Sequence, residues 1–421
     1  MPTPARALTV ATIAATALAL TATTATAAPP PRTERITLSA TGGQLTGGSG
    51  GPALSADGRH AAFASDAADV VPGDTNGVSD VFVRDLRRGT VERVTRASDG
   101  TPADAGTYTA RLSADGRYVA FTTRASNLVD WPVPQAPYSA DVYVHDRRTG
   151  TTERVTVAAD GGSAGVSDGL GLSADGRLVA FTAAADRIEG GGAPPHARAY
   201  VVDRVTGERR TISDRLPADW YVQNLRLSAD GTHAAYVPRH PRGGPGQLWL
   251  ADLRTGEQRQ LNLTPDGEPT GGGPAGLSLS ADGSRVAYGS FDDRVVPGAP
   301  EYTWELYLYD ARTGTTRWIT HEGAGGLGGG LLSPDGRRLA YTHETERPDG
   351  TTVGNIHIRE LDGPGRTVRA TDDIGGGALT EGYSAATDFA ARGRVLGLYS
   401  TSSRLVADDT NGEGDGFTVR P

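Results

Sequence analysis

The stretch Ser55-Ala56-Asp57-Gly58-Arg59 decides the fold of this chain, because versions of it recur along the whole sequence. Further copies begin at Ser113, Ser173, Ser228, Ser280 and Ser333, and a worn seventh copy covers 390–394. The glycines of successive copies lie 58, 60, 55, 52, 53 and 57 residues apart. A period of this length indicates a repeat architecture in which each copy marks one structural unit.

Each unit contains four segments that we expect to be strands. The first ends at the repeat phrase, where Asp favours a tight turn and Gly tolerates a positive φ. The second is short and apolar, as in Tyr118–Phe121, and the third runs between two acids, as in Asp141–Asp146. The fourth has the pattern of Glu153–Thr156. Four antiparallel strands repeated in tandem predict an all-β fold made of propeller blades.

The two ends of the chain predict how the ring closes. Copy seven supplies three strands and stops after Phe417–Arg420, where a fourth strand is due. Glu34–Thr37 has the fourth-strand pattern and precedes copy one. We therefore predict a seven-bladed β-propeller closed three-plus-one by the N-terminal strand, which hides the sheet edges. The alternative is six blades, with copy seven as an appendage. Three glycine-rich segments are expected to be connecting loops near the axis: 47–51, 271–273 and 325–330.

The first residues predict a secreted protein. Arg6 precedes a short apolar stretch, Ala7–Leu20, and Ala25–Ala27 fits a small-residue cleavage site. This pattern is typical of a signal peptide, since the apolar stretch is too short for a membrane span. We expect a signal peptide over 1–27, a proline-rich spacer over 28–31 and one propeller domain over 32–421, located outside the cell.

Composition excludes several classes of partner. The 421 residues carry 41 basic and 50 acidic side chains, which gives a net charge of −9. No long basic run occurs, so we expect neither nucleic acid nor a membrane surface as a partner, and we expect a monomer. Cysteine is absent, which excludes disulfides and thiolate metal sites.

A family resemblance follows from the repeat itself. The phrase Ser-x-Asp-Gly-Arg, followed by a short apolar strand with an aromatic residue, resembles the WD40-like (PD40) repeat of TolB-type propellers. The resemblance runs from about residue 32 to the end. It implies a secreted or periplasmic propeller that acts as a binding platform, and it implies nothing about chemistry.

Strand order directs the search for a binding site to one face. Turns between strands one and two, and between three and four, share a face and are uniform. The remaining loops vary and emerge on the opposite face, where binding usually resides on a rigid scaffold. Exposed aromatic residues in these loops could anchor a protein, a peptide or a cell-wall glycan, and the alternative is that they cap the blade ends. The candidates are Tyr108, Trp131, Tyr138, Trp220, Tyr221, Tyr302 and Trp304.

Two loops carry a candidate calcium site. Asp74, Asn76 and Asp80 are spaced like Asp409, Asn411 and Asp415, in copies one and seven. Alternating oxygen ligands can bind Ca²⁺, but the spacing is not that of an EF-hand loop. We therefore favour Asn-Gly turns stabilised by Asp side chains and expect no cofactor. Copy five keeps the lead-in Val296-Pro297-Gly298 without the Asp-Asn pair.

No catalytic constellation is recognisable. Segments 47–51 and 161–165 match G-x-S-x-G, but neither predicts the helix that a nucleophile elbow needs. The eight histidines lack metal-binding spacing, and we expect His321 and His343 to lie in solvated loops. The sequence thus favours a non-enzymatic binding scaffold. The alternative is a lyase or hydrolase with a site in the central channel, because fold does not settle function.

Overall fold

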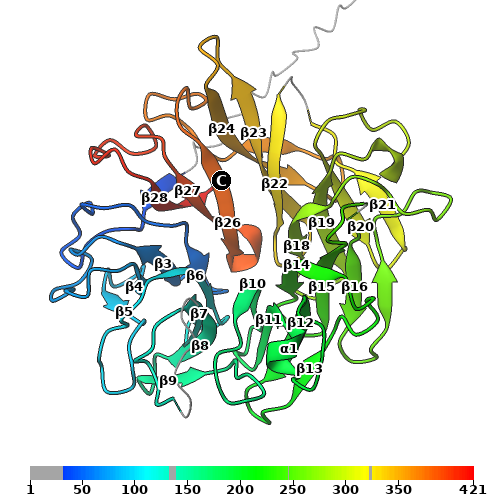
Figure 1. Ribbon diagram of the computed structural model, residues 1–421. Coiled ribbons are helices and arrows are strands. Elements are labelled where there is room, and N and C mark those ends of the chain that lie inside the picture. Colours follow the sequence, from blue (N-terminus) through cyan, green and yellow to red (C-terminus); the bar gives the residue numbers. More distant parts are fainter. Residues whose placement is uncertain (1–31, 132–138, 245, 322–324) are drawn as a thin grey trace, which may run out of the picture. The chain divides into compact units, whose positions relative to one another are not determined.

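Each copy of the repeat phrase forms the turn between the first two strands of a four-stranded antiparallel sheet. The computed structural model describes residues 32–131, 139–244, 246–321 and 325–421. Within these ranges, seven such sheets, or blades, are arranged in a ring (Figure 1). The predicted all-β propeller of seven blades is confirmed, and the six-blade alternative is wrong.

Blades 1 to 3 follow the chain in order. Blade 1 consists of β2 (Ala53–Leu54), β3 (His60–Ser65), β4 (Asp80–Asp85) and β5 (Val91–Arg93). Blade 2 consists of β6 (Thr107–Leu112), β7 (Tyr118–Thr123), β8 (Asp141–Asp146) and β9 (Thr151–Arg154). Blade 3 consists of β10 (Val166–Leu172), β11 (Leu178–Ala184), β12 (Ala197–Asp203) and β13 (Arg209–Thr211).

Blades 4 to 6 repeat the same order. Blade 4 consists of β14 (Tyr221–Leu227), β15 (His233–Arg239), β16 (Trp249–Asp252) and β17 (Gln258–Gln260). Blade 5 consists of β18 (Ala275–Leu279), β19 (Arg285–Ser290), β20 (Glu305–Asp310) and β21 (Thr315–Trp318). Blade 6 consists of β22 (Gly326–Leu332), β23 (Arg338–Glu346), β24 (Thr352–Glu360) and β25 (Thr367–Arg369).

Blade 7 joins the two ends of the chain. It consists of β26 (Ser384–Ala390), β27 (Val395–Ser400), β28 (Asp415–Arg420) and β1 (Arg32–Arg35). β1 pairs with β28, with Arg32 opposite Arg420, so the three-plus-one closure is confirmed. The strand ends at Arg35, two residues earlier than predicted. Beyond it the Thr37 hydroxyl donates to the Asp415 carboxylate at 2.9 Å instead of continuing the ladder.

Helix is confined to short pieces. The described residues contain one four-residue helix, α1 (Ala185–Ile188), and two 3₁₀ turns, η1 (Asp293–Val295) and η2 (Ala391–Gly393). In the part of the chain that the structure describes, no helix is long and apolar enough to cross a membrane. Residues 31–421 form one compact unit.

The repeat phrase is a turn stabilised by its own side chains. Ser55 Oγ donates to Asp57 Oδ1 at 2.7 Å, and the backbone N–H of Arg59 donates to the same oxygen at 2.9 Å. Ser55 Oγ in turn accepts from the N–H of His60 at 2.9 Å, and Gly58 closes the turn at φ 70°. The Ser-to-Asp hydrogen bond recurs at Ser113, Ser173, Ser228, Ser280 and Ser333.

These turns are also joined to one another around the ring by backbone hydrogen bonds. The N–H of Ala56 donates to Ala114 O at 2.9 Å, and the N–H of Ala114 donates to Ala174 O at 2.8 Å. Equivalent bonds run from 174 to 229, 230 to 281, 281 to 334 and 391 to 56. Pro334 has no N–H, so copy six cannot make this bond toward copy seven.

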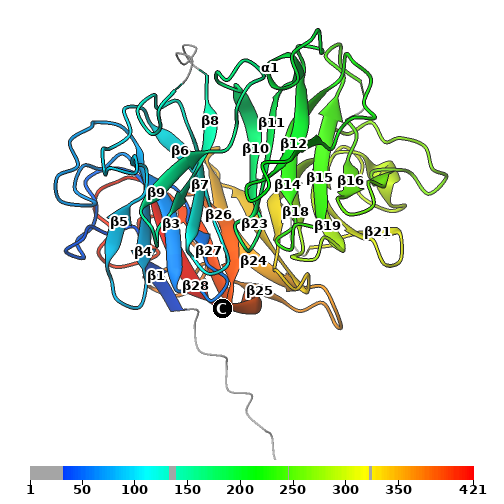
Figure 2. The same cartoon turned by 90° about the horizontal axis from the view of Figure 1, so that it is seen from below.

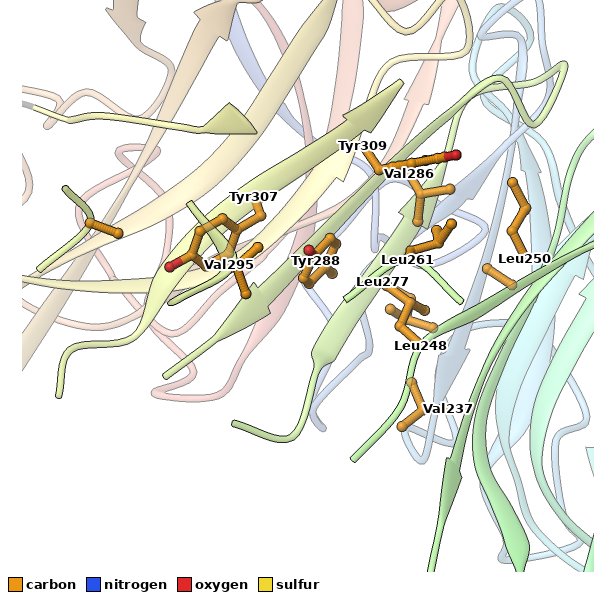
Figure 3. Packing of buried hydrophobic residues seen from close by; sticks show 12 residues of the cluster. Val237, Leu248, Leu250, Leu261, Leu277, Val286, Tyr288, Val295, Tyr307 and Tyr309 are labelled. Atoms are coloured by element: carbon orange, nitrogen blue, oxygen red, sulfur yellow. The ribbon is translucent and has the colours of Figure 1, made fainter. Parts of the chain in front are cut away.

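Stacked aromatic pairs fill the blade cores. A residue of strand two pairs across the sheet with a residue of strand three, as Phe121 does with Tyr143, whose ring centroids lie 5.9 Å apart. Figure 3 shows the pair in blade 5, Tyr288 and Tyr307, beside residues from blade 4 such as Leu248 and Leu250. Each core therefore lies at the interface between two neighbouring blades, which we call a seam. The stability of the ring depends on the packing in these seams.

One glycine-rich segment was predicted wrongly. Residues 326–330 do not form a connecting loop; they belong to β22, the innermost strand of blade 6. Inner strands crowd around the axis, where a Cβ on Gly276 of β18 would lie 3.4 Å from the Cα of Gly329. Glycine composition suggested a loop, but the tight approach of neighbouring inner strands is what requires it.

Candidate functional site

The alternation of strand direction sorts the loops onto two faces. Turns between strands one and two, and between three and four, form what we call the repeat-turn face. The loops between strands two and three, and those between blades, form the variable-loop face. Figure 2 shows strands running between the two faces, with α1 on the variable-loop face and the C-terminus at the other.

The predicted aromatic residues do not form one cluster. Tyr138 lies outside the described residues, and Tyr108 belongs to β6. Trp131 packs against the core of blades 1 and 2, and the Arg154 guanidinium lies 3.9 Å from its ring centroid. Trp220 makes an edge contact with His240, and Tyr221 is a half-buried residue of β14. Trp131, Trp220 and Tyr221 are therefore held against other parts of the protein rather than gathered on one open surface.

The remaining two predicted residues, Tyr302 and Trp304, belong to one loop of blade 5, in which Trp304 is half-buried against the core. Tyr302 is 91% exposed and Phe291 is 55% exposed, and the Phe291 ring meets the ring of Trp304 edge-on at 4.9 Å. Phe291 follows β19 and Trp304 precedes β20, so both stand at the base of one loop. We call Phe291, Tyr302 and Trp304 the aromatic platform.

The platform is held in place by polar contacts beneath it. The Trp304 ring lies so close to Gly289 that a Cβ there would approach the ring to 2.2 Å. Buried Glu305 accepts hydrogen bonds from the Trp318 indole at 2.8 Å and from the Thr303 hydroxyl at 3.0 Å. Asp292 accepts from the backbone N–H and the guanidinium of Arg294, and this pairing holds the pKa of its carboxyl below its usual value.

Comparison with blade 1 shows what is unusual about this loop. Residues 289–305 and 64–80 have the same length and share the sequence Val-Val-Pro-Gly at the same place. In this alignment Tyr302 takes the position of Gly77. Both adopt positive φ, 57° for Tyr302 and 69° for Gly77. A side chain in this region costs roughly 1 kcal/mol, and Tyr302 recovers little of it by burial.

Sequence analysis missed Phe291. The predicted residues were Tyr and Trp only, although the loops of copies one and five share the lead-in Val-Pro-Gly. The signal was present, because Phe291 takes the place of Asp66 in blade 1. Phe291 could have been identified because it places an apolar ring at a loop position where copy one has an acidic residue.

The predicted calcium ligands of blade 1 surround an arginine. Arg93 Nη1 lies 2.9 Å from Asp74 Oδ1 and 3.2 Å from Asp80 Oδ2. Asn76 donates to Asp80 at 2.8 Å and to the carbonyl of Ala103 at 3.0 Å. Burial, followed by the charge of Asp80, raises the pKa of Asp74.

Blade 7 repeats this arrangement with residues from both chain ends. Arg35 lies 3.3 Å from Asp409 and 3.2 Å from Asp415. Asn411 donates to the carbonyl of Leu45 at 3.0 Å. In both loops a guanidinium thus supplies the positive charge between the carboxylates. Among the described side chains, no group of three or more His, Asp or Glu residues could hold a metal ion.

Other chemistry-bearing residues are buried in structural roles. The serines of the two G-x-S-x-G matches, Ser49 and Ser163, are 8% and 2% exposed, and each bonds the carboxylate that opens a third strand. On the innermost strand of blade 7, Asp388 accepts from the backbone N–H of Leu54 in blade 1 at 2.7 Å. Burial raises the pKa of Asp388 to about 6, and the charge of Arg111 opposes this rise.

No protein-family model matches the sequence, and comparison with curated proteins found no match. Solved structures do match. An oligogalacturonate lyase in complex with manganese superposes with a TM-score of 0.57 at 15% identity, covering 93% of this chain and 96% of that one. The β-propeller domain of the Trilobed protease from Pyrococcus furiosus gives 0.56 at 14% identity, covering 89% and 93%.

TolB from Acinetobacter baumannii matches with a TM-score of 0.42 at 19% identity. The match covers 80% of this chain and 65% of the TolB chain. The resemblance to repeat propellers is confirmed at the level of the fold by the seven four-stranded blades and by the match to the Trilobed protease propeller. At these identities the matched structures carry no information about activity, and they include both enzymes and propellers of other kinds.

Proposed function

We propose that this protein is a secreted binding scaffold that holds a protein, peptide or cell-wall glycan at the aromatic platform of its variable-loop face. The observation that carries the proposal is Tyr302. It keeps an exposed ring at a left-handed backbone position where the equivalent loop of blade 1 has Gly77. A residue that strains the loop without packing is best explained by a contact outside the molecule.

The composition of the platform fits this role. Aromatic rings provide large contact area at low cost in conformational entropy, and Trp and Tyr are enriched among the residues that dominate binding energy. The Gly289 backbone seats Trp304, and Glu305 fixes the end of the loop from below. Phe291 and Trp304 are therefore anchored next to the ends of β19 and β20, which favours binding without rearrangement.

A second candidate function is catalysis in the central channel, and Asp388 is the observation that favours it. Its pKa of about 6 suits a general acid, and Arg111 is close enough to influence its charge. Both carboxylate oxygens accept backbone N–H groups, from Leu54 and Phe389. This use of Asp388 as a link between inner strands supports the scaffold over the enzyme.

The substitution Tyr302→Gly separates the effect of the backbone strain on stability from the effect of the aromatic ring on binding. We expect the free energy of unfolding to stay equal or to rise by up to about 1 kcal/mol, because the left-handed strain is relieved. We expect affinity for the partner to fall about 30-fold, as for a typical hot-spot residue. The partner would first be captured from culture supernatant or cell-wall glycan, and affinity then measured by calorimetry.

Val205→Ser is the matched control, since Val205 is 76% exposed but lies in the β12–β13 turn of the repeat-turn face. It should leave affinity unchanged. The chain has no lysine, so amine coupling through the N-terminus leaves both faces unmodified. Equal affinity of wild type and Tyr302→Gly would reject the platform. Turnover of a captured glycan that disappears in Asp388→Asn would favour the enzyme.

A further inference from the structure

Blade 6 departs from the other blades in its aromatic core pair. Four blades pair two carbocyclic rings at this place: Phe63 with Phe82, Phe121 with Tyr143, Phe181 with Tyr200, and Tyr288 with Tyr307. In blade 6 the pair is Tyr341 and His357, stacked at 5.9 Å. A ring that can take up a proton thus occupies a position where these four blades have Phe or Tyr.

His357 is the inner end of a row of three histidines. The ring of His343 lies 5.6 Å from that of His357, and the ring of His321 lies 5.6 Å from that of His343. The prediction of a loop is wrong for His343, which belongs to β23, whereas His321 lies in the loop after β21 as predicted. Both side chains are half-buried rather than solvated. The row leads from the core of blade 6 to the connection from blade 5.

The row lies in the seam between blades 5 and 6. Tyr341 packs in the cluster that contains Leu306 and Ile319 of blade 5, so the face of β23 that carries Tyr341 and His343 is turned toward blade 5. Nδ1 of His321 and Nδ1 of His357 are buried without a hydrogen-bond partner. A proton on His357 would therefore bring a charge into a largely apolar seam, and the hydrogen bond with the Asn355 backbone offsets this cost only in part.

The charged groups around the row do not offset such a charge. The positive charges of Arg369 in β25 and of the other two histidines all lower the pKa of His357. Two nearby carboxylates are engaged elsewhere: Glu344 of β23 accepts from the hydroxyl of Tyr383 at 3.1 Å, and Asp372 pairs with Arg369 at 2.7 Å. Burial, and then the charge of His343, lowers the pKa of His357.

We propose that His321, His343 and His357 form an acid-sensitive latch, which keeps blades 5 and 6 together while the three rings are neutral and loosens their seam when they are protonated. The inference does not depend on the proposed binding function. Histidine is the side chain whose charge normally changes between pH 5 and 8. A histidine with a lowered pKa contributes stability above about pH 6.5, and this contribution is lost as the pH falls.

Hydrogen exchange measured by mass spectrometry on the full chain at pH 7.5 and pH 5.5 tests the latch. After correction for intrinsic rates, we expect exchange in β23 and β24 to accelerate about 10-fold at pH 5.5, because protonation of the opened seam favours local opening. The equivalent strands β11 and β12 of blade 3, which contain no histidine, serve as the internal reference. The variant His321→Gln/His343→Gln/His357→Gln should lose the local acceleration.

His321→Gln alone keeps the test usable if the triple variant does not fold, and it should remove part of the acceleration. His196→Gln, in the variable-loop connection of blade 3, is the matched control and should behave like wild type. Equal acceleration in β11 and β12 of blade 3, or acceleration that persists in a folded variant, would overturn the latch. So would a rise in melting temperature with added Zn²⁺ in wild type but not in the variants, because the row would then be a metal site.

Discussion

The two faces of the ring use the same scaffold in opposite ways. On the repeat-turn face, six turns repeat one Ser–Asp hydrogen bond and link to their neighbours through backbone hydrogen bonds. On the variable-loop face, two loops of equal length have diverged: 64–80 holds an arginine between carboxylates, whereas 289–305 displays an aromatic platform. The uniform turns join neighbouring blades, so the loops on the variable-loop face can differ in sequence without loss of these links.

The same contrast extends to electrostatics. Repeat-turn aspartates at the ends of third strands pair with the arginine of the repeat phrase, as Asp146 does with Arg117 at 2.5 Å. This hydrogen bond lowers the pKa of Asp146 to about 2. On the variable-loop face, burial raises the pKa of Asp74 and of Asp415. Asp146 therefore titrates in the opposite direction from Asp74 and Asp415, whereas Asp292 on the variable-loop face, which pairs with Arg294, titrates in the same direction as Asp146.

The largest expected effect comes from breaking the ring that both faces share. Deleting residues 28–38 removes β1, buried Ile36 and the partner of Asp415. We expect a loss on the order of 5 kcal/mol or more in the free energy of unfolding, because a seam loses its core and β28 becomes an edge. Urea unfolding measures it. An unchanged midpoint would show that β1 does not close the ring.

Two glycines with similar φ test whether the repeat turns need glycine because they contact the neighbouring blade. Gly176 has φ 73°, and a Cβ there would lie 2.3 Å from the ring of Tyr118, whereas Gly150 has φ 76° and open space around it. We expect Gly176→Ala to cost about 3 kcal/mol and Gly150→Ala about 1 kcal/mol. Similar melting temperatures for the two variants would contradict the inter-blade contact.

Titration of single carboxyl groups tests the electrostatic difference between Asp146 and Asp415. Asp146 should titrate near pH 2 in carbon-13 NMR, and Asp415 should titrate above its ordinary value. The lowered pKa of Asp146 means that its pair stabilises the fold above about pH 4 and is lost as the pH falls through 2. At pH 7 we expect Asp146→Asn to cost up to about 1 kcal/mol, since the pair is partly exposed. Equal pKa values for Asp146 and Asp415 would contradict the predicted difference between these two carboxyl groups.

The smallest effect is expected from chelation. Arg93 and Arg35 already neutralise the Asp-Asn-Gly loops, so excess EDTA should change the melting temperature by less than about 1 °C. Calorimetric scans with and without EDTA, and after added Ca²⁺, make the measurement. A drop of several degrees that Ca²⁺ restores would establish a calcium site in these loops.

The sequence was sufficient for the architecture because the repeat phrase acts locally. Ser55, Asp57 and Gly58 build one turn from neighbouring residues, and their period counts the blades. The pattern of Glu34–Thr37 also predicted the closing strand, apart from its ends.

The candidate site was only partly predictable because it depends on contacts across strands and seams. Trp304 and Tyr302 were identified, but the seat that Gly289 offers to Trp304 becomes visible only when β19 and β20 are paired. Trp131 looked equally promising and instead packs under Arg154. The row through His321 and His357 joins residues 36 positions apart, and no local pattern connects them.

The register of the closing strand has a mechanical consequence. Because Arg32 at the start of β1 lies opposite Arg420 at the end of β28, the chain enters and leaves blade 7 at the same end of one strand pair. A pulling force applied between the two ends would load these pairs one at a time, from Arg32 toward Arg35, rather than shearing them together. We expect β1 to peel away at low force until it reaches the ion pairs of Arg35 with Asp409 and Asp415.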